Sequence, residues 1–236
     1  SGYEEAAGLG LIAGINASRY IDNLEPLILG RDEAYIGVMI DDLVTKGTKE
    51  PYRLLSSRAE YRLLLRSDNA DYRLTEIGKN IGLIDDERYL KFKEKYNKIN
   101  QILHILKATY LGETSSINEG LLQKGYERLS SGVKAIDILK RNGISYSFLK
   151  NYISIPTYLS LDKSGEEEVE IIAKYEGYIE GERKEVAKFK KLENLKLKES
   201  IDYSLIDGLA LEARQKLNKV KPLNIGQASR ISGVNP

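Results

Sequence analysis

Two long stretches of the chain place apolar residues at the spacing of an α-helix, and this pattern constrains the fold more than any other feature. The first is expected to run from Glu87 to about Ala108 and the second over residues 166–193. Side chains three and four residues apart share one helix face, which becomes the buried face. The first stripe consists of Phe92, Tyr96, Ile99, Leu103 and Leu106, and the second of Val169, Ile172, Tyr175, Ile179, Val186, Phe189 and Leu192. The sequence therefore predicts a mainly α-helical chain.

Residues 1–20 are expected to form another helix, which is rich in small side chains. Glu4 and Glu5 fall in its first turn, where carboxylates face the positive end of the helix dipole. The small residues that follow are Ala6, Ala7, Gly8, Gly10, Ala13 and Gly14. Glycine inside a helix costs about 1 kcal/mol relative to alanine. The glycines therefore favour a helix pressed tightly against a sheet, and that sheet is not in this chain.

The next segments carry mixed signals. Residues 21–34 are expected to form a loop, because they include Pro26 and Gly30. The run from Tyr35 to Ile40 fits either the start of a helix that ends at Lys46 or a short strand, and periodicity alone leaves both open.

A capping box is predicted at Ser57, with Glu60 three residues further on. We expect it to open a helix over about 58–66, whose one face would carry Arg58, Arg62 and Arg66.

Shorter helices are expected to complete the chain. One would start at Thr75 and end near Gly82, and Asp85 or Asp86 would cap the long helix after it. Residues 110–120 look loop-like, and residues 202–236 are expected to form a small helical tail module.

The chain starts at Ser1 and its only methionine is Met39, so we expect it to be part of a longer protein. Asn235-Pro236 resembles the start of a further helix.

Composition excludes several classes of function. The net charge is +1, so a basic surface has to come from local clustering. The chain has no cysteine and a single histidine, His104, which excludes disulfides, thiolate nucleophiles and cysteine-type zinc sites. No apolar run approaches the roughly 20 residues that span a bilayer. We expect no catalytic constellation, no metal site, no membrane association and a cytoplasmic location.

One local cluster of positive charge stands out between positions 46 and 66. Its members are Lys46, Lys49, Arg53, Arg58, Arg62 and Arg66. Only two carboxylates, Glu50 and Glu60, lie among them, and Tyr52 and Tyr61 are interleaved. Arginine binds phosphate through two parallel hydrogen bonds, and tyrosine can stack on unpaired bases. The cluster is therefore predicted to bind RNA, with pairing of the arginines to carboxylates as the alternative.

Several segments taken together resemble the MnmG/GidA family. They are GYEEAAGLGLIAG (2–14), the long stretch from EAYIGVMIDD to IGLIDDERY (33–89), KYEGYI (174–179) and IGQASRISGVNP (225–236). The resemblance covers nearly the whole chain and is weakest from about 110 to 165.

The resemblance implies a flavoenzyme that uses FAD and NADH. Members of the family add an aminomethyl or carboxymethylaminomethyl group to C5 of the tRNA wobble uridine, together with the GTPase MnmE, and act as homodimers. Residues 1–30 would be the terminal helix of an FAD-binding α/β domain that is otherwise missing, with Gly2 and Tyr3 facing the flavin. This chain alone would bind neither cofactor and would be inactive.

The other expected segments are recognition elements. Residues 31–165 would form a multi-helical C-terminal domain that carries the basic segment, and residues 166–200 a long charged helix. Residues 201–236 would be the tail module that binds the partner, through Ile225, Gln227 and Arg230. Two alternatives stay open. One is a DNA-binding helix-turn-helix regulator, although Arg230 is nearly the only basic residue of its last segment, and the other is a purely structural helical module.

Overall fold

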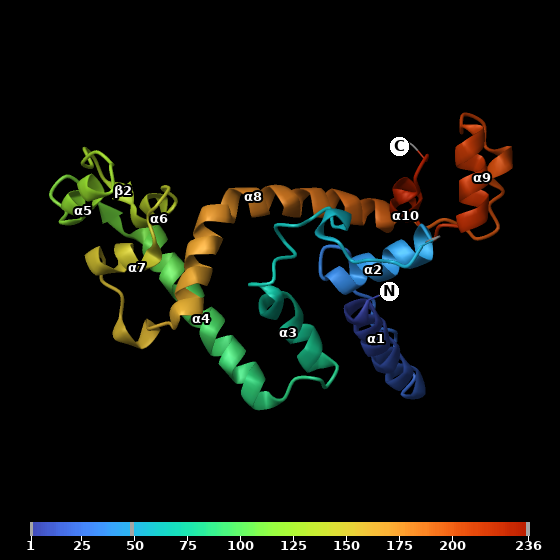
Figure 1. Ribbon diagram of the computed structural model, residues 1–236, viewed down its shortest axis with the longest axis horizontal. Helices are drawn as coiled ribbons and strands as arrows, with labels where there is room; N and C mark the ends of the chain where they lie inside the picture. The colour runs from blue at the N-terminus through green and yellow to red at the C-terminus, as the bar shows by residue number, and fades with distance from the viewer. Residues whose placement is uncertain (1, 48–49, 235–236) are drawn as a thin grey trace. The chain divides into compact units, whose positions relative to one another are not determined.

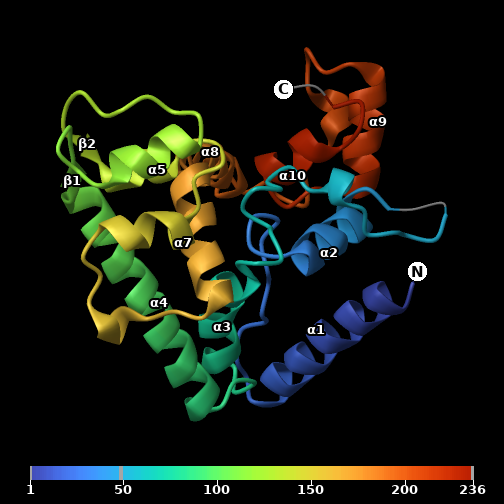
Figure 2. The ribbon, with the colours of Figure 1, turned by 60° about the vertical axis from the view of Figure 1, so that its left-hand side comes forward.

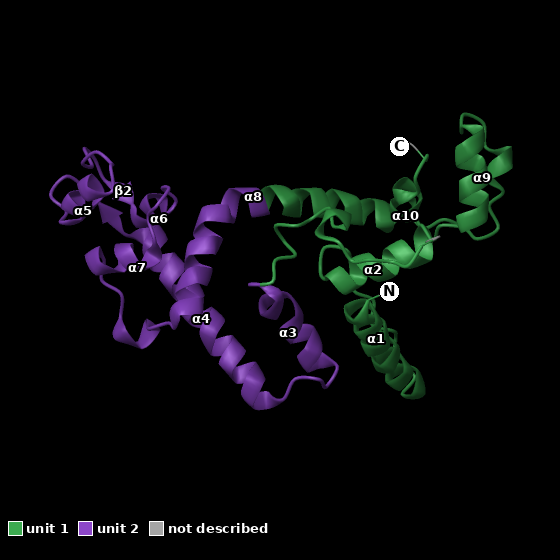
Figure 3. Cartoon of the chain, in the orientation of Figure 1, with its two compact units in different colours: residues 1–67, 180–236 green, residues 68–179 purple. Residues whose placement is uncertain are grey.

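A computed structural model describes residues 2–47 and 50–234, which form two compact units (Figure 3). Unit 1 comprises residues 1–67 and 180–236, and unit 2 comprises residues 68–179. Regular structure is almost entirely helical (Figure 1), so the mainly α-helical fold is confirmed. The four functional segments expected from the sequence are not tested by this division and stay predictions.

Unit 2 is built around α4 (Asp86–Ala108), the first of the two long helices expected from the sequence. Asp85 caps it, as predicted, because its carboxylate accepts a hydrogen bond from the backbone N–H of Arg88 at 2.7 Å. Helix α3 (Ala70–Asn80) packs against α4. It starts at Ala70, so the predicted start at Thr75 was wrong.

A two-stranded antiparallel sheet that the sequence did not predict follows α4. Strand β1 (Tyr110–Leu111) pairs antiparallel with β2 (Val133–Lys134). Helix α5 (Ile117–Gln123) lies in the connection between them. The buried side chain of Asn118 closes this connection: its amide donates to two backbone carbonyls, and its oxygen accepts from the backbone N–H of Leu129 at 2.8 Å. Because the amide nitrogen and oxygen of Asn118 are both hydrogen-bonded, these bonds offset the cost of burying them and fix the loop.

The remaining elements of unit 2 enclose its apolar core. They are α6 (Ala135–Leu139), α7 (Tyr146–Leu149), the 3-10 turns η2 (Lys150–Tyr152) and η3 (Thr157–Leu159), and the first part of α8 (Lys163–Glu193). Helix α6 and turn η3 pack against α4, as α3 does (α3 and α4 are seen side by side in Figure 2). Two members of the stripe predicted for α4, Ile99 and Leu106, are completely buried in the core. Ile102, which the prediction left out, is completely buried as well.

Unit 1 begins with α1 (Tyr3–Ile21) and α2 (Tyr35–Thr45), which pack against each other. The ambiguous segment from Tyr35 is thus a helix. Gly8 is the close contact of α1, since a Cβ there would lie 3.3 Å from the side chain of Met39. The surroundings of Gly10 and Gly14 are open, because a Cβ at either position would have nothing within 4 Å. The close neighbour expected along the whole small-residue face is therefore absent from the described part of the chain.

The helix predicted over 58–66 was wrong. In its place the chain forms a single 3-10 turn, η1 (Ser56–Arg58), followed by an irregular turn in which the N–H groups of Leu64 and Leu65 donate to the carbonyl of Tyr61. Arg58, Arg62 and Arg66 consequently do not share a helix face.

The tail of unit 1 is helical, as expected. After α8 come η4 (Tyr203–Leu205), α9 (Leu211–Val220) and α10 (Ile225–Arg230). Asn224 caps α10 by accepting from the N–H of Gln227 at 2.8 Å. A small apolar cluster holds these elements together, and its buried members are Tyr203, Leu217, Ala228 and Ile231. The helix start predicted at Asn235-Pro236 lies outside the described residues.

Candidate nucleic-acid interface

Arg31 organises the interior of unit 1. It lies in the loop before α2, and only 7% of its side chain is exposed. Its guanidinium contacts the carboxylates of Asp41 at 3.0 Å, Asp42 at 2.8 Å and Glu60 at 2.9 Å. It also donates to the backbone carbonyl of Arg58 at 3.1 Å. One side chain therefore ties the loop before α2, the helix itself and the basic segment together.

Asp42 is the acceptor at the centre of this network. It lies on the buried face of α2, four residues after Val38 and three after Met39, which are both fully buried. Lys46 donates to its Oδ1 at 2.8 Å, and the hydroxyl of Tyr52 donates to its Oδ2 at 2.9 Å. A buried carboxylate is tolerated only when it is paired and hydrogen-bonded. Here each of the two carboxylate oxygens of Asp42 accepts a hydrogen bond.

The network shifts the proton equilibria of its members. Burial acts to raise the pKa of Asp42, but the hydrogen bonds from Lys46 and Arg31 outweigh it and hold that pKa below its usual value. Burial, together with the hydrogen bond to Asp42, raises the pKa of Tyr52 far above its usual value. Asp42 is therefore ionised and Tyr52 is protonated near neutral pH.

The same network explains why residues 58–66 do not form a helix. Glu60, the expected capping-box partner, instead makes a two-oxygen contact with Arg31. Nε of Arg58 donates to the backbone carbonyl of Arg53 at 2.7 Å, and its guanidinium carbon lies 4.4 Å from the centre of the Tyr52 ring. A capping box contributes about 1 kcal/mol, whereas a charged hydrogen bond to a largely buried group contributes about 1.5–3 kcal/mol. The long-range contacts are therefore the stronger ones, and they determine the backbone conformation of residues 58–66.

Two of the predicted RNA-binding cations are presented to solvent. Arg53 has 64% of its side chain exposed, and its guanidinium lies 3.8 Å from the carboxylate of Glu5. Arg62 is exposed, and it has no hydrogen bond or ion pair with any residue in the described ranges. These two side chains keep their donors available for a phosphate.

Three of the other predicted cations, all in the described ranges, contact groups of the chain itself. Lys46 bonds Asp42 and is 37% exposed. Arg58, also 37% exposed, lies 4.0 Å from Asp42. Arg66 donates to the backbone carbonyl of Leu63. Lys49 lies outside the described residues. For Lys46 and Arg58 the geometry favours the alternative in which basic residues pair with carboxylates.

The two interleaved tyrosines differ. Tyr52 is 4% exposed and its hydroxyl is bound to Asp42, so its ring has no face for a base. Tyr61 is half-buried and lies at the wall of a hollow in unit 1. Burial, followed by the nearby charge of Glu60, raises the pKa of Tyr61.

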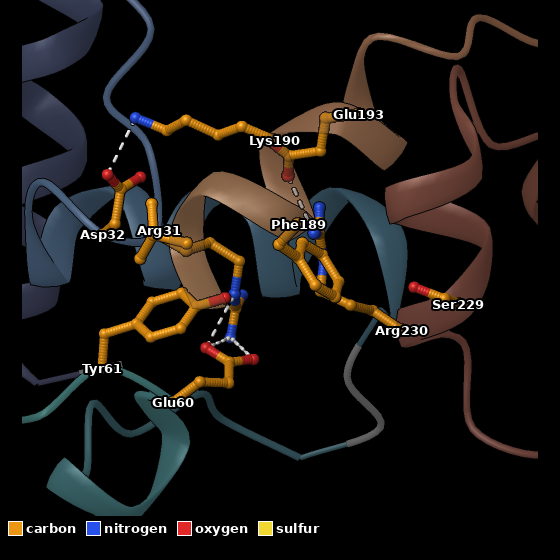
Figure 4. A pocket seen from close by; sticks show the side chains of 10 residues that line it. Arg31, Asp32, Glu60, Tyr61, Phe189, Lys190, Glu193, Ser229 and Arg230 are labelled. Carbon is orange, nitrogen blue, oxygen red and sulfur yellow. Dashed lines mark hydrogen bonds and ion pairs between the residues drawn. The ribbon is translucent and has the colours of Figure 1, made fainter. Parts of the chain in front are cut away.

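The hollow has a volume of about 240 Å³ and is formed by four segments of unit 1 (Figure 4). Its lining residues are Arg31, Asp32, Glu60, Tyr61, Val186, Phe189, Lys190, Glu193, Ser229 and Arg230. Lys190 of α8 bridges to Asp32 at 2.8 Å, which fastens the last part of α8 to the loop before α2. The hollow is therefore held by ion pairs rather than by a continuous apolar core.

Arg230, one of the three residues predicted to bind a partner, is built into this region. Its side chain is 8% exposed and contacts Asp41 of α2 at 3.0 Å and Glu193 of α8 at 2.9 Å. Its guanidinium carbon lies 5.3 Å from the centre of the Phe189 ring. The guanidinium thus fastens α10 inside unit 1 and is not presented to solvent.

The other two predicted partner-binding residues lie at the start of α10. Ile225 is 37% exposed. The side-chain oxygen of Gln227 accepts a hydrogen bond from the N–H of Leu223, whose own side chain is 66% exposed. Ile225 and Leu223 are thus the exposed apolar positions at this end of α10.

Gly2 and Tyr3, predicted to face a flavin, lie at the start of α1. The N–H of Gly2 donates to the carboxylate of Glu5 at 2.6 Å, and the same carboxylate accepts from the N–H of Leu54 at 2.8 Å. These hydrogen bonds, that of Leu54 above all, outweigh burial and lower the pKa of Glu5. The carboxylate of Glu5 thus lies at the positive end of the helix dipole, and the contact of Gly2 and Tyr3 with a flavin stays a prediction. Tyr3 is 94% exposed.

Arg31 and Asp42 are the important residues that the sequence reasoning missed. A signal was present for Asp42, because a carboxylate three and four positions after buried apolar residues has to be buried as well. A buried Asp needs a cationic partner, and Arg31 is the nearest arginine in the preceding loop. The signal for Arg31 is therefore indirect, because it depends on Asp42 and not on the pattern around Arg31 itself.

Neither a metal site nor a membrane span emerges from the described residues. Within 2–47 and 50–234, no three or more histidine, cysteine, aspartate or glutamate side chains are grouped so that they could hold a metal ion. In the same ranges, no helix has the length and apolar character needed to cross a membrane.

Comparison with known proteins now adds to this geometry. Residues 86–183 match the "tRNA modifying enzyme MnmG/GidA C-terminal helical domain", and residues 185–236 match the "tRNA modifying enzyme MnmG/GidA C-terminal helical bundle". All 236 residues align with proteins named tRNA uridine 5-carboxymethylaminomethyl modification enzyme MnmG, at 54% identity in Caldicellulosiruptor saccharolyticus and 55% in Listeria monocytogenes. The chain belongs to the MnmG/GidA family. It spans 37% of the length of these relatives.

Solved structures of the MnmG/GidA family agree with this assignment. The chain is similar over its whole length to GidA of Aquifex aeolicus in two crystal forms, with 43% identity, TM-scores of 0.79 and 0.76, and coverage of 36% of those chains. The matched helical bundle contains the residues that α8 and α10 contribute to the hollow. Arg31, Asp32, Glu60 and Tyr61 come from a part of the chain before both matched regions.

Proposed function

We propose that this chain is the tRNA-binding region of an enzyme that adds a carboxymethylaminomethyl or aminomethyl group to C5 of the tRNA wobble uridine. The observation that carries the proposal is the alignment of all 236 residues with enzymes named for that modification. In this proposal the parent enzyme is a cytoplasmic homodimer that uses FAD and NADH, with the GTPase MnmE as its partner. The chain by itself binds neither cofactor and is inactive.

The geometry of unit 1 supports Arg53 and Arg62 as the phosphate contacts. Both are exposed, and both lie on a segment whose backbone is held by Arg31. A guanidinium on a fixed backbone loses less freedom when it binds, which favours its use in recognition. Lys46 and Arg58 contribute positive potential nearby, while Lys46 donates to Asp42 and the guanidinium of Arg58 lies 4.0 Å from the same carboxylate.

The test measures binding of an unmodified tRNA transcript to the 236-residue chain over a series of salt concentrations. We expect Arg53→Ala together with Arg62→Ala to weaken binding and to lower the salt slope by about 2, because each lost phosphate contact removes about 1. The matched control is Lys91→Ala together with Lys163→Ala. It removes the same charge from exposed positions of unit 2, where the side chains are 73% and 92% exposed. Equal slopes for the two variants would show that binding is unspecific charge attraction.

The two alternatives make different predictions for the same assay. A helix-turn-helix regulator would prefer duplex DNA over tRNA, but Arg230, the one basic residue within α10, is 8% exposed and paired. A purely structural module would bind neither nucleic acid. A competition between tRNA and random-sequence duplex DNA distinguishes all three.

The partner surface is proposed to be the exposed apolar end of α10. Ile225 and Leu223 are exposed there, while Gln227 holds the backbone of Leu223. We expect Ile225→Asp to weaken capture of the GTPase MnmE and to leave the melting of the tail unchanged. Leu205→Asp, at a 79% exposed position of η4, is the matched control. Unchanged capture by Ile225→Asp would place the partner elsewhere.

A further inference from the structure

The hollow of unit 1 has the size of a small ring system. At about 240 Å³ it is smaller than the roughly 300–1,000 Å³ of sites that take drug-sized ligands. A flavin or nicotinamide dinucleotide is therefore too large for it. Residues from the loop before α2, from the 60–61 turn, from α8 and from α10 converge on the hollow (Figure 4).

The charges around the hollow cancel one another in pairs. Arg31 contacts Glu60, Lys190 contacts Asp32, and Arg230 contacts Glu193. Each positive side chain thus has a carboxylate of the same lining as its partner. A free phosphate or another multiply charged anion would have to displace these carboxylates. The lining suits a neutral group with polar edges.

Two aromatic side chains provide flat apolar faces. Tyr61 comes from the turn after η1, and Phe189 comes from α8 (Figure 4). Aromatic rings and guanidinium planes are the surfaces on which proteins stack unpaired nucleobases. The guanidinium of Arg230 already lies over the Phe189 ring.

Arg230 also has a donor that no group of the described residues satisfies. Both of its Nη atoms bond carboxylates, but its buried Nε has no hydrogen-bond partner among the described residues. Only 8% of the Arg230 side chain is exposed. An unpaired polar atom there is unusual, since buried polar atoms are nearly always paired. Arg230, which lines the hollow, therefore keeps one unmatched N–H donor beside the Phe189 ring. A nucleobase offers the complementary combination of a π-face and in-plane acceptors.

We propose that this hollow holds a single unstacked nucleobase of the bound tRNA, with Phe189 and Tyr61 as stacking faces and Nε of Arg230 as a donor to a base acceptor. The inference rests on the proposed tRNA binding and adds to it a position at which a base is recognised. Arg62 follows Tyr61 directly and is free to contact a phosphate beside that base. A phosphate contact and a base contact would then lie next to each other on one turn.

The direct test observes the Nε–Hε group of Arg230 by NMR in the full 236-residue chain. The signal is assigned by its loss in Arg230→Lys. We expect it to shift when uridine, adenosine or an unmodified tRNA transcript is added, and its exchange with solvent to slow. If the signal stays unmoved when uridine, adenosine and tRNA are each added to excess, the pocket does not take a base and the inference is overturned.

Affinity measurements separate the base contact from the phosphate contact. We expect Phe189→Leu, which keeps apolar volume but removes the ring, to weaken tRNA binding by roughly five- to a hundredfold with an unchanged salt slope. Phe148→Leu is the matched control, since this partly buried ring lies against the core of unit 2. Arg62→Ala should lower the slope instead. Thermal melting checks that each variant is folded.

The outcomes distinguish this inference from the function on which it rests. If tRNA binds with the expected salt slope but folded Phe189→Leu binds as well as the wild type, only the base pocket is overturned. If tRNA fails to bind and neither nucleoside moves the Arg230 signal, both are overturned. A shift with nucleosides but no tRNA binding keeps the hollow as a nucleobase pocket, but overturns the proposed function and the assignment of the base to tRNA.

Discussion

Units 1 and 2 have interiors of opposite character. Unit 2 has one large apolar core, in which α4 alone contributes three completely buried side chains, Ile99, Ile102 and Leu106. The apolar cluster beside α2 in unit 1 is small, with Val38, Ala59 and Leu65 as its buried members. Next to it lie two buried charged side chains, Arg31 and Asp42.

This difference indicates different roles. Apolar burial is non-directional and stabilises in proportion to area, so unit 2 has the interior of a scaffold. Buried ion pairs add little net stability, because desolvation offsets their attraction, but they require a particular geometry. The network of Arg31 fixes the backbone from which Arg53 and Arg62 extend. We infer that unit 1 uses charge to position a recognition surface.

The largest effect is expected in the core of unit 2. Ile99→Ala should lower the free energy of unfolding of unit 2 by about 3–4 kcal/mol, because it leaves a cavity at a completely buried site. Ile99→Val, the control, should cost about 1 kcal/mol. Urea denaturation followed by NMR signals from each unit measures this. If the signals of unit 1 are lost at the same lowered midpoint, the two units do not unfold independently and the comparison fails.

The next largest effect is expected at Asp42. Asp42→Ala should destabilise unit 1 by about 2–3 kcal/mol, less than the roughly 3–5 kcal/mol for a broken isolated buried pair, because Arg31 keeps Asp41 and Glu60. Tyr52→Phe removes one hydrogen bond to the same carboxylate and should cost about 1 kcal/mol. The same denaturation assay applies, read from the signals of unit 1. A loss for Asp42→Ala no greater than for Tyr52→Phe would contradict the central role of Asp42.

The contrast between the units also explains what the sequence could predict. Helices α4 and α8 were predictable, because their apolar stripes and the cap at Asp85 are local signals. The two-stranded sheet of β1 and β2 was not predictable, because strands of two residues are too short to show alternation of apolar and polar residues.

The failures at the candidate site share one physical cause. The capping-box signal at Glu60 was overridden by Arg31, which is 29 positions away. Arg230 donates a hydrogen bond to Asp41, which is 189 positions away in the sequence. The basic segment could be recognised from composition, but which cations remain free depends on pairings that no local pattern records. Arg62 and Arg58 look alike in sequence, and only the fold distinguishes them.

Acidification should weaken unit 1 through Asp42. Its pKa is lower in the folded chain than its ordinary value of 3.8, so the stability it contributes is complete above that pH and is lost as the pH falls through the folded value. The expected loss is smaller than that of Asp42→Ala, because a protonated carboxyl still accepts hydrogen bonds. Thermal melting of unit 1 below about pH 4 measures it. Asp42→Asn should flatten the acid limb of unit 1, and an equally steep limb in that variant would assign the acid sensitivity to other carboxylates.

The smallest effect is expected for an exposed ion pair. Glu87 and Lys91 lie one turn apart on α4, at 2.6 Å, with 79% and 73% of their side chains exposed. Water screens such a pair, and two flexible side chains lose freedom to make it, so Glu87→Gln should shift the melting temperature of unit 2 by at most about two degrees. Asp42→Asn, the same change of charge at a buried position, should shift unit 1 by more. Similar shifts would mean that burial does not set the strength of these pairs, and the electrostatic account of unit 1 would then lose its basis.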